Sequence, residues 1–227
     1  MNWLKSLLTK RSGSSKAAAA EAHRTARESL KTLQLTLIKQ LPPAAFPEAA
    51  KKLGLAKVGT IVIQQDDEFA VVYDHCIHHH RRTGKNIIER TAESDTSTDM
   101  LMALNDSFFS VFKVDEINPH LGAQLTDIIT GTPLSLFDRS VADNGQKNLL
   151  LVGRLVPIDG GYISTGWLIP TLEPVFESRL KPIIERFTNS RDQLSETQHA
   201  AMEAQILRVC LQFTSEDLGF FTDMDFT

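Results

Sequence analysis

The chain has 227 residues, of which 42% are hydrophobic and 23% charged, and its formal net charge is −4. This length and apolar content suit one large domain, or a small domain with helical flanks, and are sufficient for a true core. The negative charge argues against broad coating of nucleic acid, and no apolar run reaches membrane-spanning length. Two cysteines, Cys76 and Cys210, are too few for a disulfide framework, so we expect both to be buried in a cytoplasmic protein.

Residues 1–16 form a basic, amphipathic N-terminal segment. Its apolar residues share one helical face: Trp3, Leu4, Leu7 and Leu8. Such a helix is compatible with weak peripheral contact with a membrane surface, with docking on its own protein, or with a frayed terminus. Residues 12–15, Ser-Gly-Ser-Ser, predict a flexible break after it.

Residues 17–107 read as mainly helical. The expected elements, in chain order, are a helix over 17–41, a short helix over 47–53, a strand over 58–64, a helix over 66–82 that ends at Thr83-Gly84, a capped helix opening at Asn86, and a helix over 98–105. The helix opening at Asn86 rests on a capping pattern, because Glu89 follows three residues later.

The helix expected over 66–82 has the most unusual composition in the chain, since it contains Asp74 followed by four histidines within six residues. At 100° per residue, Asp74, His75, His78 and His79 lie together, opposite an apolar face. Imidazoles four residues apart can hold Zn²⁺ or another divalent ion, with a carboxylate as a further ligand. The ligand set is incomplete, so a solvated polar face whose histidines titrate near neutral pH, and an anion site formed by protonated histidines, stay open as alternatives.

Residues 108–171 carry the densest strand signals. Five short strands are expected, over 108–117, 124–130, 133–137, 149–158 and 162–169. They are separated by Asn-Pro, Thr-Gly-Thr, Asn-Gly and Asp-Gly-Gly segments, which are turn signals. Five strands at this spacing predict a small antiparallel β-barrel or sandwich, and the whole chain is therefore expected to be an α+β protein with helical N- and C-terminal flanks.

Residues 172–213 predict two amphipathic helices, over 175–187 and 196–213, with Ser195 as a cap of the second. Residues 214–227 form an acidic tail with four large apolar residues: Leu218, Phe220, Phe221 and Phe226. An acidic-aromatic tail of this kind can dock into a groove of a protein partner, or its phenylalanines can fold back onto the barrel as core.

Searches for catalytic motifs find none. The chain lacks a Gly-x-Ser-x-Gly elbow, a phosphate-binding loop, a dinucleotide fingerprint and a Cys-x-x-Cys pair. The barrel strands carry only Lys113 and Arg154 as basic residues, which disfavours a nucleic-acid-binding barrel.

Several segments together resemble a module of uncharacterised bacterial proteins. They are Leu53-Gly54, Val58 to Ile63, Asp66 to Asp74, Ser110 to Val114, Asp127 to Gly131, and the closing pair over 149–158 and 162–169. The resemblance covers roughly residues 50 to 172 and implies a helical segment followed by a small barrel. It carries no established activity and no functional residues.

The sequence therefore favours a non-catalytic cytoplasmic interaction module that binds a protein partner through the barrel surface or the acidic tail, and that needs no cofactor. The alternative, from a different class, is a metal-binding protein, a hydrolase among the options. It would hold Zn²⁺ or another divalent ion with Asp74, His75, His78 and His79.

Overall fold

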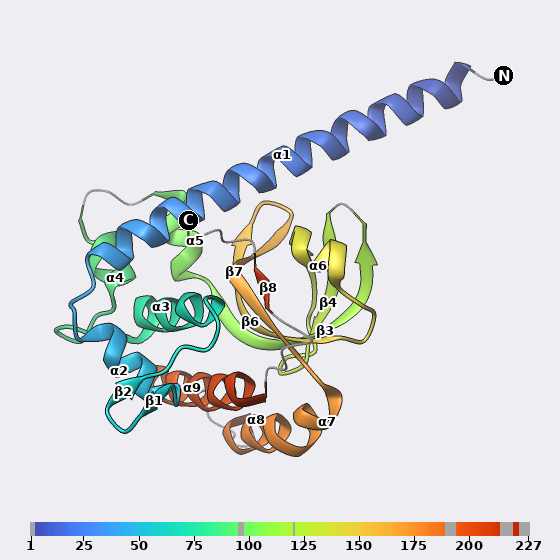
Figure 1. Ribbon diagram of the computed structural model, residues 1–227. Coiled ribbons are helices and arrows are strands. Elements are labelled where there is room, and N and C mark those ends of the chain that lie inside the picture. Colours follow the sequence, from blue (N-terminus) through green and yellow to red (C-terminus); the bar gives the residue numbers. More distant parts are fainter. Residues whose placement is uncertain (1–2, 95–97, 120, 189–193, 214–219, 223–227) are drawn as a thin grey trace.

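A computed structural model describes residues 3–94, 98–119, 121–188, 194–213 and 220–222, with residues 3–20 and Thr222 described as backbone only. The molecule is an α+β protein in which a closed β-barrel is flanked by helices (Figure 1). The N-terminal part of the first helix extends away from this body.

Five strands form the barrel: β3 (Phe108–Asn118), β4 (Gly122–Asp127), β5 (Pro133–Phe137), β6 (Leu150–Ile158) and β7 (Gly161–Thr171). They pair antiparallel in the order β5-β4-β3-β6-β7. A parallel contact between β5 and β7, at Leu136 and Tyr162, closes the sheet. The expected barrel is thus confirmed except for this one pairing, which makes it mixed rather than wholly antiparallel.

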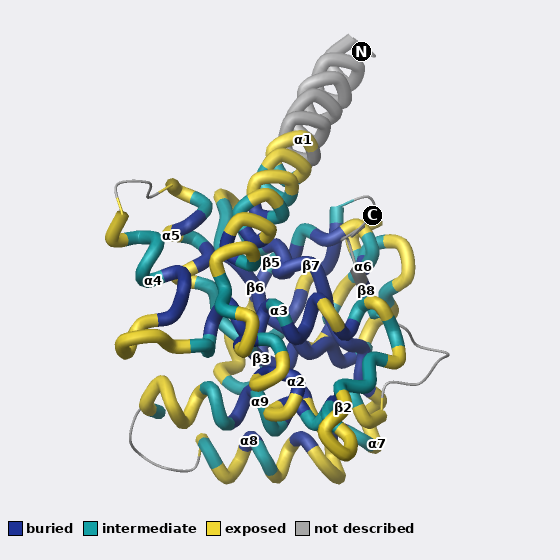
Figure 2. Tube along the Cα trace, turned by 60° about the vertical axis from the view of Figure 1, so that its left-hand side comes forward, coloured by how far each residue is buried: buried dark blue, intermediate teal, exposed yellow. Residues whose placement is uncertain are grey.

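The barrel interior is filled by the apolar residues that alternate along these strands. Its largest fully buried members include Phe112, Leu125, Leu136 and Leu151. Figure 2 shows the buried residues gathered in the strands, with the outer turns of the helices exposed. A short strand, β8 (Phe221–Thr222), adds to the outer edge of β7.

The flanking elements are α1 (Trp3–Lys39), α2 (Ala45–Lys52), β1 (Ala56–Lys57), β2 (Thr60–Ile61), α3 (Asp67–His79), α4 (Ile87–Ala92), α5 (Asp99–Asn105), α6 (Arg139–Asn144), α7 (Glu173–Val175), the π-helical turn η1 (Phe176–Leu180), α8 (Lys181–Thr188) and α9 (Glu196–Phe213). The capping box at Asn86 and Glu89 is confirmed. Cys76 and Cys210 are both buried, as expected, and neither forms a disulfide within the described residues.

α1 contradicts the flexible break expected at residues 12–15, because the helix runs unbroken from Trp3 to Lys39. A glycine inside a helix costs only about 1 kcal/mol relative to alanine, and Ala17 to Ala20 follow directly, so the helix continues. Among the described helices, none combines the length and the apolar character needed to cross a membrane.

The strand expected over 58–64 is instead a small hairpin of β1 and β2. Val58 and Gly59 form its turn with φ of 49° and 81°, and Lys57 pairs with Thr60. Positive φ at both turn positions matches the right-handed twist of a two-residue hairpin, and here a β-branched residue adopts it.

α3 ends earlier than expected, at His79, because His80 has an extended backbone with ψ of 111°. Thr83 and Gly84 do not cap it. They form a separate turn with positive φ that joins Arg82 and Lys85.

Candidate functional site: a buried ionic cluster between two cavities

α3 is buried on both of its faces. Asp74, His75 and His78 are only 2%, 2% and 8% exposed. The solvated histidine face considered from the sequence is therefore wrong. The face is buried by tertiary packing, because Arg154 of β6 and Glu203 of α9 both contact it.

Arg154 lies at the centre of this cluster and is itself buried. Its Nε donates to Asp74 Oδ2 at 3.2 Å, and its Nη2 donates to Glu203 Oε2 at 2.5 Å. The same Nη2 is 3.5 Å from His79 Nε2. One guanidinium thus links helix α3, strand β6 and helix α9 through charge-assisted hydrogen bonds.

Glu203 presents its second oxygen to two histidines. His79 Nε2 is 3.0 Å and His75 Nδ1 is 3.4 Å from Glu203 Oε1. The ligand atoms of these three residues all lie within 4.8 Å of one another. The pair four residues apart on α3 therefore meets a carboxylate from a helix more than a hundred residues later in the chain.

The other two residues of the sequence-based metal set lie apart from this group. Asp74 turns to Arg154, and His78 Nε2 is 3.7 Å from Asp74 Oδ1, beyond hydrogen-bond distance. Both of these atoms are buried without a hydrogen-bond partner among the described residues. The structure thus brings His75 and His79 together with Glu203 and leaves Asp74 and His78 to one side.

Burial sets the charge states in the cluster. It lowers the pKa of His75 and holds that of His78 well below 6.5, with Arg154 adding to the effect on His78. Burial also raises the pKa of Asp74 to about 6, against the opposing pull of Arg154. Burial alone would raise the pKa of Glu203 as well, but Arg154 and the histidines hold it well below its usual value of 4.5. At pH 7 the cluster therefore holds two carboxylates, one guanidinium, and neutral imidazoles at His75 and His78.

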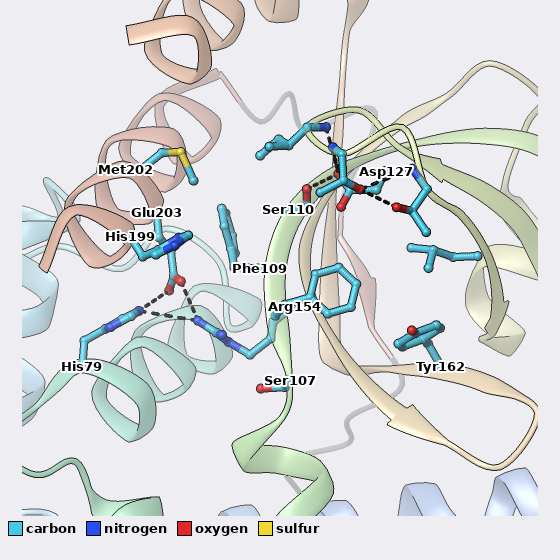
Figure 3. Close-up of a pocket in the computed structure, with 15 residues that line it drawn as sticks. His79, Ser107, Phe109, Ser110, Asp127, Arg154, Tyr162, His199, Met202 and Glu203 are labelled. Atoms are coloured by element: carbon cyan, nitrogen blue, oxygen red, sulfur yellow. Dashed lines mark hydrogen bonds and ion pairs between the residues drawn. The ribbon is translucent and has the colours of Figure 1, made fainter. Parts of the chain in front are cut away.

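The cluster forms the wall between two cavities. The first, of about 560 Å³, runs from His79, Arg154 and Glu203 along β3 to Ser110 and Asp127. Figure 3 shows the charged residues at one end and the Ser110–Asp127 pair at the other. The second cavity, of about 530 Å³, is lined by His75 and His79 from the opposite side. His79 therefore borders both.

Two members of the cluster were missed from the sequence, and each left a signal there. Arg154 is a charge in the middle of the apolar run of β6. Glu203 lies on the apolar stripe of α9, three residues before Ile206 and seven before Cys210. A charge on an otherwise apolar face indicates a buried partner of opposite sign.

Of the four apolar residues in the tail, two lie among the described residues and two do not. Phe221 is 7% exposed and packs into the barrel core, and half-buried Phe220 packs against the core between barrel and helices. Leu218 and Phe226 lie outside the described residues.

Fold and site together define a helix-flanked β-barrel protein with a buried Arg-Glu-His cluster. The chain belongs to a family of unknown function, DUF7986, whose profile matches residues 18–195. This agrees with the resemblance to an uncharacterised module of helices followed by a barrel. The matched span includes α3 and Arg154 and ends directly before α9, which carries Glu203. No curated protein and no solved structure matches the chain significantly.

Proposed function

We propose that the protein binds a divalent transition-metal ion, Zn²⁺ in the first instance, through His75, His79 and Glu203. The observation that carries the proposal is the approach of all three ligand atoms to within 4.8 Å of one another. Two imidazoles and one carboxylate form a ligand set that zinc uses in sites with an open fourth position.

The charges around the three residues support a cation there. Asp74 and Glu203 against Arg154 leave one net negative charge in a buried setting when the imidazoles are neutral. Arg154 occupies Oε2 of Glu203, so Oε1 stays directed at the two histidines. The guanidinium also orients the carboxylate, as residues behind a metal ligand commonly do.

The competing explanation is a hydrogen-bonded network without an ion. In it, His75 Nδ1–H and His79 Nε2–H both donate to Glu203 Oε1, and the cluster serves stability alone. The two explanations differ in one measurable quantity, the metal content of the purified protein.

The test is elemental analysis of untagged protein purified without metal-affinity resin, followed by Zn²⁺ titration of the chelator-treated protein. We expect about one equivalent of metal and a rise in melting temperature with Zn²⁺, as for any ligand that binds the native state. His79→Ala and Glu203→Gln should abolish both effects. His80→Ala is the matched control, because His80 pairs with Glu48 and is not among the three ligands. Absence of metal together with no thermal shift in the wild type would leave only the hydrogen-bonded network.

A protein partner bound through the barrel surface or the acidic tail is the second candidate. Its support is the acidic and aromatic composition of residues 214–227. Deleting residues 223–227 leaves β8 in the chain, so that a loss of partner binding can be distinguished from a loss of stability. Loss of a defined partner from the shortened protein, at unchanged melting temperature, would support it, whereas an unchanged partner set would remove the end of the tail from consideration. A cytoplasmic location belongs with either candidate, and its support is that the chain has only two cysteines, too few for a disulfide framework.

A further inference from the structure

The second cavity differs from the first in its charge. It lies where α2, the end of α3 and residues 196–208 of α9 meet, and three basic side chains line it: Lys52, Arg81 and Arg208. One acidic side chain, Glu196, also lines it. Small alanines of α9 form much of the remaining wall, which leaves room for a ligand of about the size of the cavity, roughly 530 Å³.

Two of the three basic groups are not neutralised. Arg81 pairs with Glu196 at 2.8 Å and with Glu89 at 3.3 Å, so the one acidic lining residue is already matched. Neither Lys52 nor Arg208 forms an ion pair with an acidic residue in the part of the chain that the structure describes. The cavity therefore has an excess of positive charge, although the whole chain is negative.

The cavity lining includes a further polar group. His75 lines it, and His75 Nε2 is buried without a hydrogen-bond partner among the described residues. Lys52 and His75 line the same cavity. A buried polar atom without a partner is costly; with Nδ1–H directed at Glu203, His75 Nε2 is an acceptor, so a water or a ligand hydroxyl that donated to it would remove that cost.

We propose that this cavity binds an oxyanion, either free phosphate or the phosphate group of a small phosphate monoester, with Lys52 and Arg208 as its principal cationic contacts. Arginine offers a planar pair of donors that suits a phosphate, and lysine acts as a point charge. The cavity is larger than one phosphate, so its alanine wall can accept the uncharged part of an ester. This site goes beyond the proposed metal site. It stands on its own cationic residues and shares with the metal ligands only His75 and His79.

The experiment uses the full chain after chelator treatment, so that metal binding plays no part. Inorganic phosphate and glycerol phosphate are titrated separately by calorimetry, with chloride at matched ionic strength as the reference. We expect saturable binding of at least one of them, and the stronger of the two identifies the source of the phosphate. Lys52→Gln and Arg208→Gln should each weaken binding roughly tenfold, as for the loss of one charged hydrogen-bond donor.

Lys51→Gln is the matched control, because it removes the same charge from the neighbouring position of α2, outside the cavity lining. Arg208→Lys keeps the charge and should bind more tightly than Arg208→Gln. No saturable phosphate effect in the wild type, or an equal loss in the Lys51 variant, would overturn the inference. Glu203→Gln should lose Zn²⁺ binding but keep phosphate binding. That result would show that the two sites are independent of each other.

Discussion

Arg154 of β6 and Glu203 of α9 approach to 2.5 Å inside the protein, and both side chains are almost wholly buried. This contact joins the barrel to the C-terminal helix and orients the carboxylate that the histidines face. A buried ion pair seldom adds net stability compared with apolar residues, but breaking one side of it is expensive. The pair is therefore where the fold and the candidate site are most sensitive to change.

Arg154→Met should destabilise the protein by roughly 3 to 5 kcal/mol, because Asp74 and Glu203 would be left buried without a cation. Urea denaturation at pH 7 measures the change. Lys113→Met, on the neighbouring strand β3 with a half-exposed side chain, is the control and should cost less than about 0.5 kcal/mol. Similar losses in both variants would mean that Arg154 contributes no more than a surface charge.

The free energy of unfolding of the metal-free protein should fall as the pH is lowered below about 6.5. Burial lowers the native pKa of His75 and His78 from 6.5, so the unfolded chain takes up protons that the native state does not. Their contribution to stability is therefore fully present above that pH and is lost progressively as the pH falls from 6.5 through their lower native pKa values.

Asp74 acts in the opposite sense, because its native pKa is raised from 3.8 to about 6. As the pH falls through about 6, this carboxyl binds a proton in the native state before it does so in the unfolded chain. Protonation of Asp74 therefore favours the folded state. Two histidines oppose one aspartate, so the free energy of unfolding should still decrease as the pH falls below about 6.5. Urea denaturation below that pH should show the decrease, and His78→Gln should make it smaller. An unchanged decrease in the variant would mean that His78 titrates alike in both states.

The elements that could be predicted from the sequence are those specified locally. The strands of the barrel follow from alternating apolar residues and turn residues, and the helix that begins at Ile87 follows from its Asn86 cap. The parallel contact of Leu136 with Tyr162 joins distant segments, and no local pattern encodes it. The candidate site could likewise be predicted only in part. The spacing of His75 and His79 is visible in sequence, but the choice of Glu203 over Asp74 depends on how α9 packs against α3.

Gly122→Ala should destabilise the barrel by roughly 3 kcal/mol or more, since strain and a backbone clash combine at this position. Its φ is +148°, and a Cβ there would lie 1.9 Å from the carbonyl oxygen of Leu136. Gly131→Ala is the control. It also has a positive φ, of +73°, but a Cβ would meet no atom within 4 Å, so only the backbone cost of about 1 to 2 kcal/mol applies. Thermal unfolding of the two variants should rank them in that order, and equal melting temperatures would contradict close packing of β4 on β5.

Phe221→Ala separates the two roles considered for the end of the chain. If Phe221 acts as core, its truncation should cost roughly 3 kcal/mol, because the side chain is buried among barrel residues and β8 pairs with β7 at Leu168. Phe213→Ala, at a 46% exposed position of α9, is the matched control and should cost about 1 kcal/mol or less, including its contact with Arg179. A Phe221 variant with unchanged stability would contradict the structural role and return this residue to the candidates for partner binding. A destabilised Phe221 variant would assign Phe221 to the core and remove it from the docking candidates of the tail.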